Sequence, residues 1–458
     1  MNPADEELIR FESKLRDELA SLAVPDSLGS RIAARRQRRH VWPTGRLASL
    51  AALVLVVIVA TAAVYATLQP RHGQTPGGAV APLGPVCLAP GSVQLMAVSG
   101  ASPRDVWAVG GIIVGRNELW QTLAERWTGD QWQVIPTPSP GTEYNMLLGV
   151  TVVGPGDAWA VGFSQGRSGE RPLIEHWDGR QWVVVSSPSL DLTGLTGSAS
   201  LTAVSASGPA DAWAVGWAAD GGAPQQPIAE HWNGNNWTLV ASPRLPMPDL
   251  RGPTGAVLTA VDDISQTDAW AVGNYAGNNR RQALIEYWDG QSWLQSSPPS
   301  VEEGVNSLTG VVASAQGNMW ATGTPETPSS HYPALVVALD RGQWQLMRTT
   351  GTAQMYSALA GVAMDPGGEL WAVGYTRAST QAPERALIVR ASSQGWTKVP
   401  APETGPGGSA LVGVTAISQT DAWAVGSVPS LTCGGPGYPL IEHWNGHRWG
   451  VSVLGKRQ

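Results

Sequence analysis

The sequence is poor in cysteine and histidine, and this shortage argues against several kinds of site. Its 458 residues include 2 Cys and 7 His. Cys87 and Cys433 stand far apart and belong to no C-x-x-C pair, so neither a zinc site nor a thioredoxin-like redox motif is indicated. The G-x-S-x-G, H-E-x-x-H, P-loop and dinucleotide-binding patterns are also lacking. We therefore expect no catalytic residues, no metal and no cofactor.

Positive charge is scarce over most of the chain. The sequence has 29 Lys and Arg against 36 Asp and Glu, a formal net charge of −7. Only the first 46 residues carry a positive excess, with 9 basic and 7 acidic side chains. A nucleic-acid-binding surface needs a basic patch, so no nucleic-acid partner is expected.

Charge is missing altogether from one long apolar run at residues 47–68. Its 22 residues suffice for a helix that crosses a bilayer of roughly 30 Å. The flank directly before the run carries six arginines, namely Arg31, Arg35, Arg36, Arg38, Arg39 and Arg46. Only Arg71 follows closely, so the positive-inside rule predicts a single-pass protein of the cell membrane with a cytoplasmic N-terminus. The alternative, a cleaved signal peptide, fits poorly with so long a polar segment before the apolar run.

Phenylalanine is nearly absent, whereas tryptophan is abundant and periodic. The sequence has 2 Phe, 22 Trp, 54 Gly and 35 Pro, a composition that favours short strands joined by turns. The hexad D-A-W-A-V-G, or a close variant, recurs at spacings of 50–57 residues. Its tryptophans are Trp107, Trp159, Trp213, Trp270, Trp320, Trp371 and Trp423. A period of this length is typical of propeller repeats.

Each hexad lies in the same succession of four short motifs. An L-x-x-V segment precedes it, and an L-I-E-H-W segment and a W-x-x-V segment follow it. Four strands make one blade, so the sequence predicts an all-β fold with a seven-bladed β-propeller over residues 91–458. The remaining parts are a cytoplasmic helical segment (1–46), the transmembrane helix (47–68) and a linker rich in Pro and Gly (69–90).

Asp-Gly and Asn-Gly pairs separate the third and fourth strands. These pairs are Asp178-Gly179, Asn233-Gly234, Asp289-Gly290 and Asn445-Gly446. Such pairs favour positive φ at both turn positions and predict tight hairpins.

The repeat unit resembles a kelch-type propeller repeat and is similar to the propeller of galactose oxidase. The resemblance covers nearly everything after residue 90 and is one of architecture, so it implies a propeller fold for this part of the chain; the positive-inside rule places that part outside the cytoplasm. A copper oxidase is not implied, because the central blades contain no Cys. Sialidase-like hydrolysis would need a Tyr-Glu pair among arginines, and Glu143-Tyr144 is the only adjacent pair in the loops. We therefore expect no enzyme activity.

The repeated side chains are expected to be structural. Of the 22 Trp, all but Trp42, Trp120 and Trp217 occupy repeat positions, which suits packing between blades better than ligand stacking. The recurring Glu-His pairs lie in different blades and cannot converge on one metal.

No strand exchange between the chain ends is needed to complete a blade, so ring closure must have another origin. Cys87 precedes the first blade, and Cys433 lies in the loop between the second and third strands of the last. The topology brings both to one face, and we predict a disulfide between them. The alternative is two free thiols.

The same face carries the loops between second and third strands, which are long and dissimilar. Binding residues favour such loops on a rigid scaffold. The candidate ligand-binding residues there are Arg116, Trp120, Arg167, Arg171, Trp217, Tyr275, Arg280, Arg281, Tyr332, Tyr375, Arg377 and Arg385. Arginine beside aromatic rings suits sugars or anionic groups. The alternative is a set of solvated loops with scattered charge.

The cytoplasmic segment has an apolar stripe at Leu8, Phe11, Leu15, Leu19 and Leu22. It weakly resembles the tail of bacterial anti-sigma factors before their membrane helix, although the zinc-binding His and Cys of that family are absent. The stripe is either a site for a cytoplasmic regulator or a segment lying on the membrane surface.

The sequence thus favours a binding or sensing protein whose propeller recognises an extracellular protein or carbohydrate. A surface adhesion protein without signalling and a sialidase- or lyase-type enzyme are the alternatives.

Overall fold

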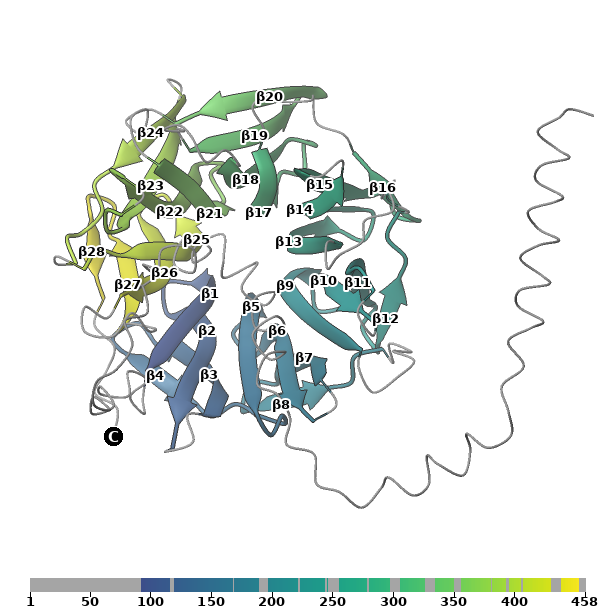
Figure 1. Ribbon diagram of the computed structural model, residues 1–458. Coiled ribbons are helices and arrows are strands. Elements are labelled where there is room, and N and C mark those ends of the chain that lie inside the picture. Colours follow the sequence, from purple (N-terminus) through teal and green to yellow (C-terminus); the bar gives the residue numbers. More distant parts are fainter. Residues whose placement is uncertain are drawn as a thin grey trace, which may run out of the picture. The chain divides into compact units, whose positions relative to one another are not determined.

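The computed structural model describes most of the chain from residue 92 to residue 452 (Figure 1). The described ranges are 92–115, 119–167, 169–188, 197–220, 223–243, 245, 255–277, 280–296, 305–325, 334–349, 356–379, 381–392, 395–404, 407–429 and 438–452. The predicted cytoplasmic segment, membrane helix and linker lie outside these residues, as do Cys87 and Cys433. Within the described ranges every regular element is a strand, and none contains a helix that could span a bilayer.

The strands follow one another in groups of four. Blade 1 contains β1 (Val93–Ser102), β2 (Asp105–Val114), β3 (Leu119–Trp127) and β4 (Trp132–Ile135). Blade 2 contains β5 (Tyr144–Gly154), β6 (Asp157–Gly166), β7 (Gly169–Trp177) and β8 (Trp182–Val185). Blade 3 contains β9 (Ser198–Gly208), β10 (Asp211–Ala219), β11 (Gln226–Trp232) and β12 (Trp237–Val240). Blade 4 contains β13 (Ala256–Ser265), β14 (Asp268–Gly277), β15 (Arg280–Trp288) and β16 (Trp293–Gln295).

The last three blades repeat the pattern. Blade 5 contains β17 (Val305–Ala313), β18 (Met319–Pro325), β19 (Leu335–Asp340) and β20 (Gln343–Arg348). Blade 6 contains β21 (Tyr356–Met364), β22 (Leu370–Arg377), β23 (Arg385–Ser392) and β24 (Gly395–Val399). Blade 7 contains β25 (Ala410–Ser418), β26 (Asp421–Val428), β27 (Tyr438–Trp444) and β28 (Trp449–Val451). The prediction of seven four-stranded units is confirmed for the described residues.

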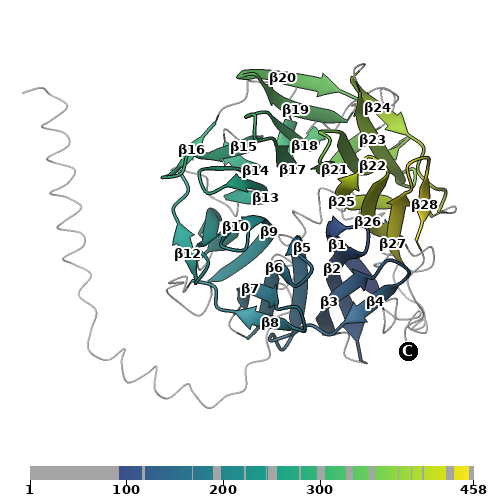
Figure 2. The same cartoon turned by 180° about the vertical axis from the view of Figure 1, so that it is seen from behind.

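Each blade is an antiparallel meander, and the blades surround a common centre (Figures 1 and 2). The first strand of each blade is innermost and contacts the first strand of the next. Blades 1 and 2 are further joined by a parallel bridge between Trp120 and Tyr144, which merges them into one eight-stranded sheet.

Side-chain packing closes the ring, with no exchanged strand among the described residues. Strand β1 contacts β25, β26 and β27 of blade 7. The ring of Trp127 lies 5.0 Å from that of Trp423, and Trp132 Nε1 donates to Ser452 Oγ at 3.2 Å. The prediction that each blade comes from one continuous segment is therefore confirmed.

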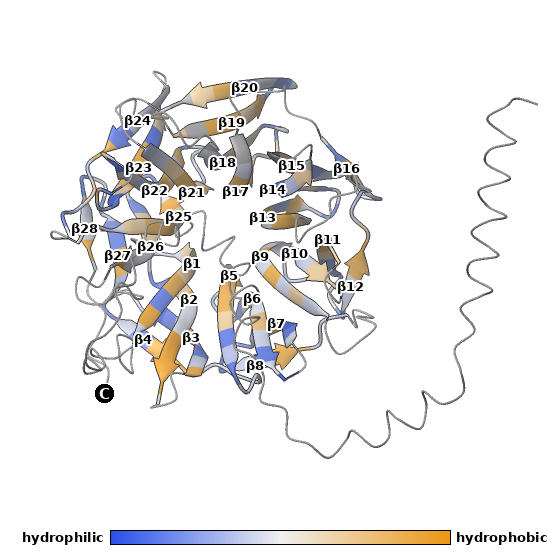
Figure 3. Cartoon of the chain, viewed as in Figure 1, coloured by the Kyte–Doolittle hydropathy of each residue, from blue (hydrophilic) through white to orange (hydrophobic). Residues whose placement is uncertain are grey.

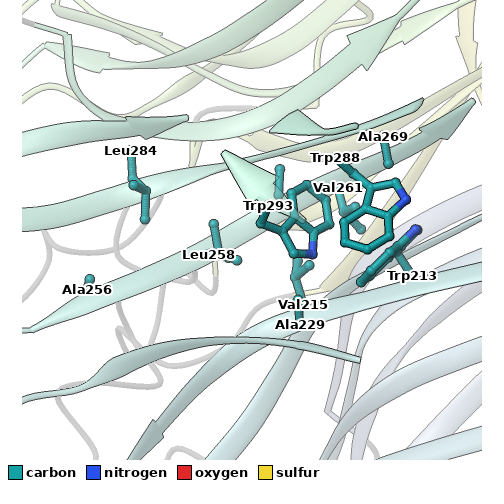
Figure 4. Close-up of a cluster of buried hydrophobic side chains, with 11 residues drawn as sticks. Trp213, Val215, Ala229, Ala256, Leu258, Val261, Ala269, Leu284, Trp288 and Trp293 are labelled. Carbon is teal, nitrogen blue, oxygen red and sulfur yellow. The ribbon is translucent and has the colours of Figure 1, made fainter. Parts of the chain in front are cut away.

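Tryptophans fill the boundary between neighbouring blades. In Figure 4, Trp213 of β10 meets Trp288 and Trp293 of the next blade, and both ring centroids lie 4.8 Å from it. All three are at least nine-tenths buried. Each such ring buries about 200 Å², which contributes up to about 5 kcal/mol before entropic costs. The structural role predicted for these rings is confirmed at this boundary.

Hydrophobic and hydrophilic residues are interspersed along the strands, as Figure 3 shows in orange and blue.

The glycine of the hexad cannot be replaced by a residue with a side chain. A Cβ on Gly216 would lie 2.0 Å from Ser200 O in the adjacent inner strand, a separation that no real Cβ atom tolerates. The same conflict, at 1.9–2.1 Å, recurs at the hexad glycine of every blade, from Gly110 to Gly426. The glycine lets the second strand lie close to the inner one, where the register shifts.

The turn between the third and fourth strands differs from the predicted tight hairpin. In blade 2 the paired residues Trp177 and Trp182 enclose four residues, of which Gly179 has a φ of 90°. Asp178 Oδ1 accepts hydrogen bonds from the N–H groups of Arg180 and Gln181 at 2.8 and 2.9 Å. Among the described non-glycine residues only Arg341 has positive φ, so the expectation of positive φ at both turn positions was wrong. The aspartate side chain supplies the turn's hydrogen bonds and makes that conformation unnecessary.

In the first two blades the segments between second and third strands are more regular than predicted. Strands β2 and β3 pair as far as Val114 and Leu119, and β6 and β7 pair as far as Gly166 and Gly169. In blades 1 and 2 most residues that the sequence assigned to long loops therefore extend the two strands. Longer connections, as predicted, remain in blade 3, between Ala219 and Gln226, and in blade 6, between Arg377 and Arg385.

Candidate functional site

A groove of about 810 Å³ lies on the face where the second and third strands connect. One wall is the segment that leads from blade 1 into blade 2, and the other is the hairpin between β6 and β7. Its lining residues are Pro140, Gly141, Thr142, Glu143, Ser164, Gln165, Gly166, Arg167, Gly169 and Arg171. The volume falls within the range of about 300–1,000 Å³ typical of ligand sites. We call it the blade 1–2 groove.

The incoming segment is fixed by a buried amide. Asn145 is 2% exposed, and its Oδ1 accepts a hydrogen bond from Gly141 N at 2.6 Å. Its Nδ2 donates to Gly141 O at 2.9 Å and to Trp120 O at 3.2 Å. Glu143 N donates to Gln165 O at 3.0 Å, which joins the two walls. The groove is therefore preorganised by hydrogen bonds across the blade boundary.

A stack of three aromatic rings supports the groove. Tyr144 follows Glu143 directly, and its ring lies 5.3 Å from that of Trp120 and 5.4 Å from that of Phe163. Trp120, a predicted site residue, is half-buried in this stack and does not line the groove. Its role here is to hold the wall in place.

The two predicted arginines of blade 2 are brought together. Arg167 is exposed and Arg171 is half-buried, and both line the groove. Arg171 Nη1 donates to Gly197 O at 3.1 Å, which restricts the guanidinium. Glu143 is exposed on the facing wall. The groove thus carries two positive charges and one negative charge.

A buried carboxyl group lies next to the lining residues. Glu170 is 8% exposed, and its Oε2 has no hydrogen-bond partner among the described residues. Burial raises the pKa of Glu170 to about 7. Burial, reinforced by the nearby Glu170 carboxyl, also raises the pKa of Tyr144 above its ordinary value. Sequence reasoning missed Glu170, because its residue type alone does not indicate burial.

The other candidates lie in separate blades. Trp217 is buried in blade 3, and Tyr275 of blade 4 donates its hydroxyl to Gln282 Oε1 at 2.7 Å. Arg280 begins β15, and the next residue, Arg281, is exposed. The structure does not gather these residues with Arg167 and Arg171 into one site.

Blade 6 holds a second group of predicted residues, which are largely buried. Tyr375 and Arg377 are 5% and 9% exposed, and the Arg377 guanidinium lies 5.7 Å from the ring of Tyr356. Burial raises the pKa of the nearby Glu384 to about 7, and burial with the Glu384 charge raises that of Tyr375 to about 12. Arg385 is exposed. Arg116 and Tyr332 lie outside the described residues.

The recurring Glu and His side chains have structural partners. Thr137 Oγ1 donates to Glu175 of the next blade, and Ser187 Oγ donates to Glu230 at 2.8 Å. His176 Nε2 lies 2.8 Å from Asp157 Oδ1. The predicted structural role of the Glu-His pairs fits these contacts. The sequence did not show that a hydroxyl at the end of one blade reaches the glutamate of the next.

A small cavity lies between the inner strands, and its lining includes both small residues and larger ones such as Met96 and Leu148. The cavity has a volume of about 180 Å³ and is bounded by the seven inner strands. Each inner strand contributes a small residue to this lining, namely Ala97, Gly149, Ala203, Ala260, Gly310, Gly361 and Gly413.

An aspartate connects blades 4 and 5. Asp262 Oδ2 accepts a hydrogen bond from Ala313 N at 2.7 Å, and burial raises the pKa of this carboxyl to about 6. Asp262 therefore links two blades.

The described residues contain no group of three or more His, Cys, Asp or Glu side chains arranged to hold a metal ion. Arginine, glutamate, amide and hydroxyl groups in the blade 1–2 groove are suited to hydrogen-bonding a polar ligand.

Neither a protein family model nor a curated protein matches this chain. Solved structures are similar at low identity. YCF48 bound to D1 peptide is 15% identical, with a TM-score of 0.41 and coverage of 70% of this chain and 84% of that one. YCF48 from Cyanidioschyzon merolae is 16% identical, with a TM-score of 0.44 and coverage of 71% and 90%. The SapL1 lectin in complex with alpha methyl fucoside is 11% identical, with a TM-score of 0.39 and coverage of 80% and 97%. The strand order and the closed ring of this chain themselves identify it as a repeat protein with a β-propeller fold.

Proposed function

We propose that this protein is a membrane-anchored binding or sensing protein whose extracytoplasmic propeller recognises a protein or carbohydrate ligand. The observation that carries the proposal is the blade 1–2 groove, in which Arg167, Arg171 and Glu143 face one preorganised space. A rigid site loses little conformational entropy when it binds, so a few charged hydrogen bonds suffice for specific recognition.

The role is proposed to be non-catalytic. Carboxyl groups with a raised pKa are good acid–base candidates in general, but here Glu170 and Glu384 belong to blades 2 and 6. Burial is the main cause of the raised pKa of each, and no second carboxyl contributes to it. Binding explains the groove without an acid–base pair.

The anchor and the signalling route are inferred from sequence. Residues 47–68 would cross the membrane with the arginine-rich flank inside, which puts the propeller outside. The propeller is proposed to be of the kelch type. The apolar stripe of residues 1–46 would bind a cytoplasmic regulator in the manner of an anti-sigma factor, so that ligand binding outside alters regulation inside.

The groove is tested by probing glycan and peptide arrays with the full-length protein in detergent micelles. The test variant is Arg167→Ala with Arg171→Ala, and the control is Arg180→Ala, which removes one positive charge from a turn on the opposite face. Each arginine that makes a charged hydrogen bond contributes about 1.5–3 kcal/mol, so bound probes should weaken about tenfold or more in the double variant. If every bound probe binds the double variant as tightly as the wild type, the groove is not the site.

A further inference from the structure

The chemical groups in the blade 1–2 groove define the ligand more closely. Arg167, Arg171, Glu143 and Gln165 all end in planar groups, and each can form two parallel hydrogen bonds. Neighbouring hydroxyls on a sugar ring act as paired donors and acceptors for such groups. A carboxylate on the same ring would match a guanidinium bidentately.

The walls of the groove lack the features that usually bind an extended peptide. An extended peptide binds through a free strand edge or through pockets for alternate side chains. Here the backbone of the wall is already used, since Glu143 N donates to Gln165 O and both polar atoms of Gly141 bond to Asn145. Pro140 is the one lining residue with an apolar side chain. A hydrophobic anchor residue would therefore find no pocket.

Glycine residues allow a ligand to approach the backbone closely. Gly141, Gly166 and Gly169 line the groove and present no side chain. A Cβ on Gly141 would lie 2.6 Å from Gln165 O, so the two walls are in close contact at this point. A flat sugar ring can lie against such a surface while its hydroxyls reach the polar side chains of the groove.

We infer that the blade 1–2 groove binds an acidic sugar of the uronic acid type, as found in acidic polysaccharides. The sugar carboxylate binds Arg167 and Arg171, and its ring hydroxyls donate to Glu143. This inference rests on the proposed binding function and narrows it to one class of ligand.

Substitution of Glu143 can distinguish a specific sugar site from a surface that attracts any negatively charged polymer. If the arginines attract any polyanion, the negative charge of Glu143 opposes binding, and its removal strengthens binding. If Glu143 accepts hydrogen bonds from sugar hydroxyls, its removal weakens binding. The two explanations predict opposite signs for one substitution.

The experiment measures binding of four soluble polymers to the immobilised full-length protein in detergent micelles at constant salt. The polymers are polygalacturonate, its methyl ester, poly-glutamate and neutral dextran. The proteins are the wild type, Glu143→Ala, Arg167→Ala with Arg171→Ala, and the Arg180→Ala control. Thermal unfolding of each variant verifies that the propeller is intact.

Polygalacturonate is expected to bind the wild type, and its methyl ester to bind about tenfold more weakly, because the ester lacks the charge that the guanidinium groups bind. The double arginine variant should lose about tenfold or more and Glu143→Ala several-fold, while Arg180→Ala remains unchanged.

Stronger polygalacturonate binding by Glu143→Ala, or poly-glutamate binding as tight as that of polygalacturonate, would overturn the sugar inference. It would also be overturned if polygalacturonate fails to bind while an array peptide binds in a manner that depends on Arg167 and Arg171. In both cases the proposed binding function stands. Binding that no groove variant alters would contradict both.

Discussion

Glutamine in place of Glu442 is expected to stabilise the propeller at neutral pH but not in acid. Glu442 lies in β27, is fully buried, and has no hydrogen-bond partner for either carboxyl oxygen among the described residues. In blades 2 and 3 a hydroxyl from the preceding blade donates a hydrogen bond to the equivalent glutamate, as Ser187 does to Glu230. The corresponding residue before blade 7, five positions after its tryptophan, is Ala401.

The magnitude follows from proton linkage. Burial raises the pKa of Glu442 from 4.5 to about 8, so the folded state keeps a proton that the unfolded state loses. The contribution of this group to stability is complete below pH 4.5 and is lost as the pH rises towards 8. The loss is about 1.4 kcal/mol per pH unit, or about 3 kcal/mol at pH 7. Glutamine keeps the shape and does not titrate, so Glu442→Gln should gain about 2–3 kcal/mol at pH 7 and less than about 1 kcal/mol at pH 5.

Thermal unfolding followed by tryptophan fluorescence between pH 5 and pH 8 measures the effect. The Tm difference between Glu442→Gln and the wild type should widen as the pH rises. Glu403→Gln, at an exposed position, is the control and should follow the wild type at every pH. Parallel Tm curves for Glu442→Gln and the wild type from pH 5 to pH 8 would refute the reasoning, because Glu442 would then not hold its proton.

Three further outcomes are expected. Gly216→Ala should prevent or strongly weaken folding, since its Cβ would collide with the inner strand, whereas Gly208→Ala, with nothing within 4 Å, should leave Tm nearly unchanged. Ser187→Ala removes the 2.8 Å hydrogen bond to Glu230 and should lower the free energy of unfolding by about 1–3 kcal/mol, measured by urea denaturation; a neutral result would show that the bond is unimportant. Cys433→Ser should lower stability by about 2–4 kcal/mol under oxidising conditions and match the reduced wild type, as expected for a disulfide that staples the ring; equal stability of oxidised variant and wild type would indicate free thiols.

The sequence by itself determined the architecture of the propeller. The hexad around Trp213 recurs in seven copies, and each copy carries the same strand pattern and the same tryptophans. Such information is local and repeated, so strand order, blade number and the packing role of the rings could be read from it. The glycine of the hexad could also be recognised in the sequence, but the structural reason for a glycine at this position could not. Only the register of two paired strands brings the Cβ position of Gly216 against Ser200 O.

The tertiary structure decided which candidate residues share a site. Of the arginines and aromatic residues assigned to the loops of one face, Arg167 and Arg171 line a common groove, whereas Trp217 and Tyr375 are buried. Strand extension causes this, because each added pair turns alternate side chains inward. Arg167 and Arg171 line one groove with Glu143 only because residues 140–143, arriving from blade 1, lie against the β6–β7 hairpin. The position of residues 140–143 depends on the hydrogen bonds of the buried Asn145 and on the closed ring of blades. No local sequence pattern encodes that position.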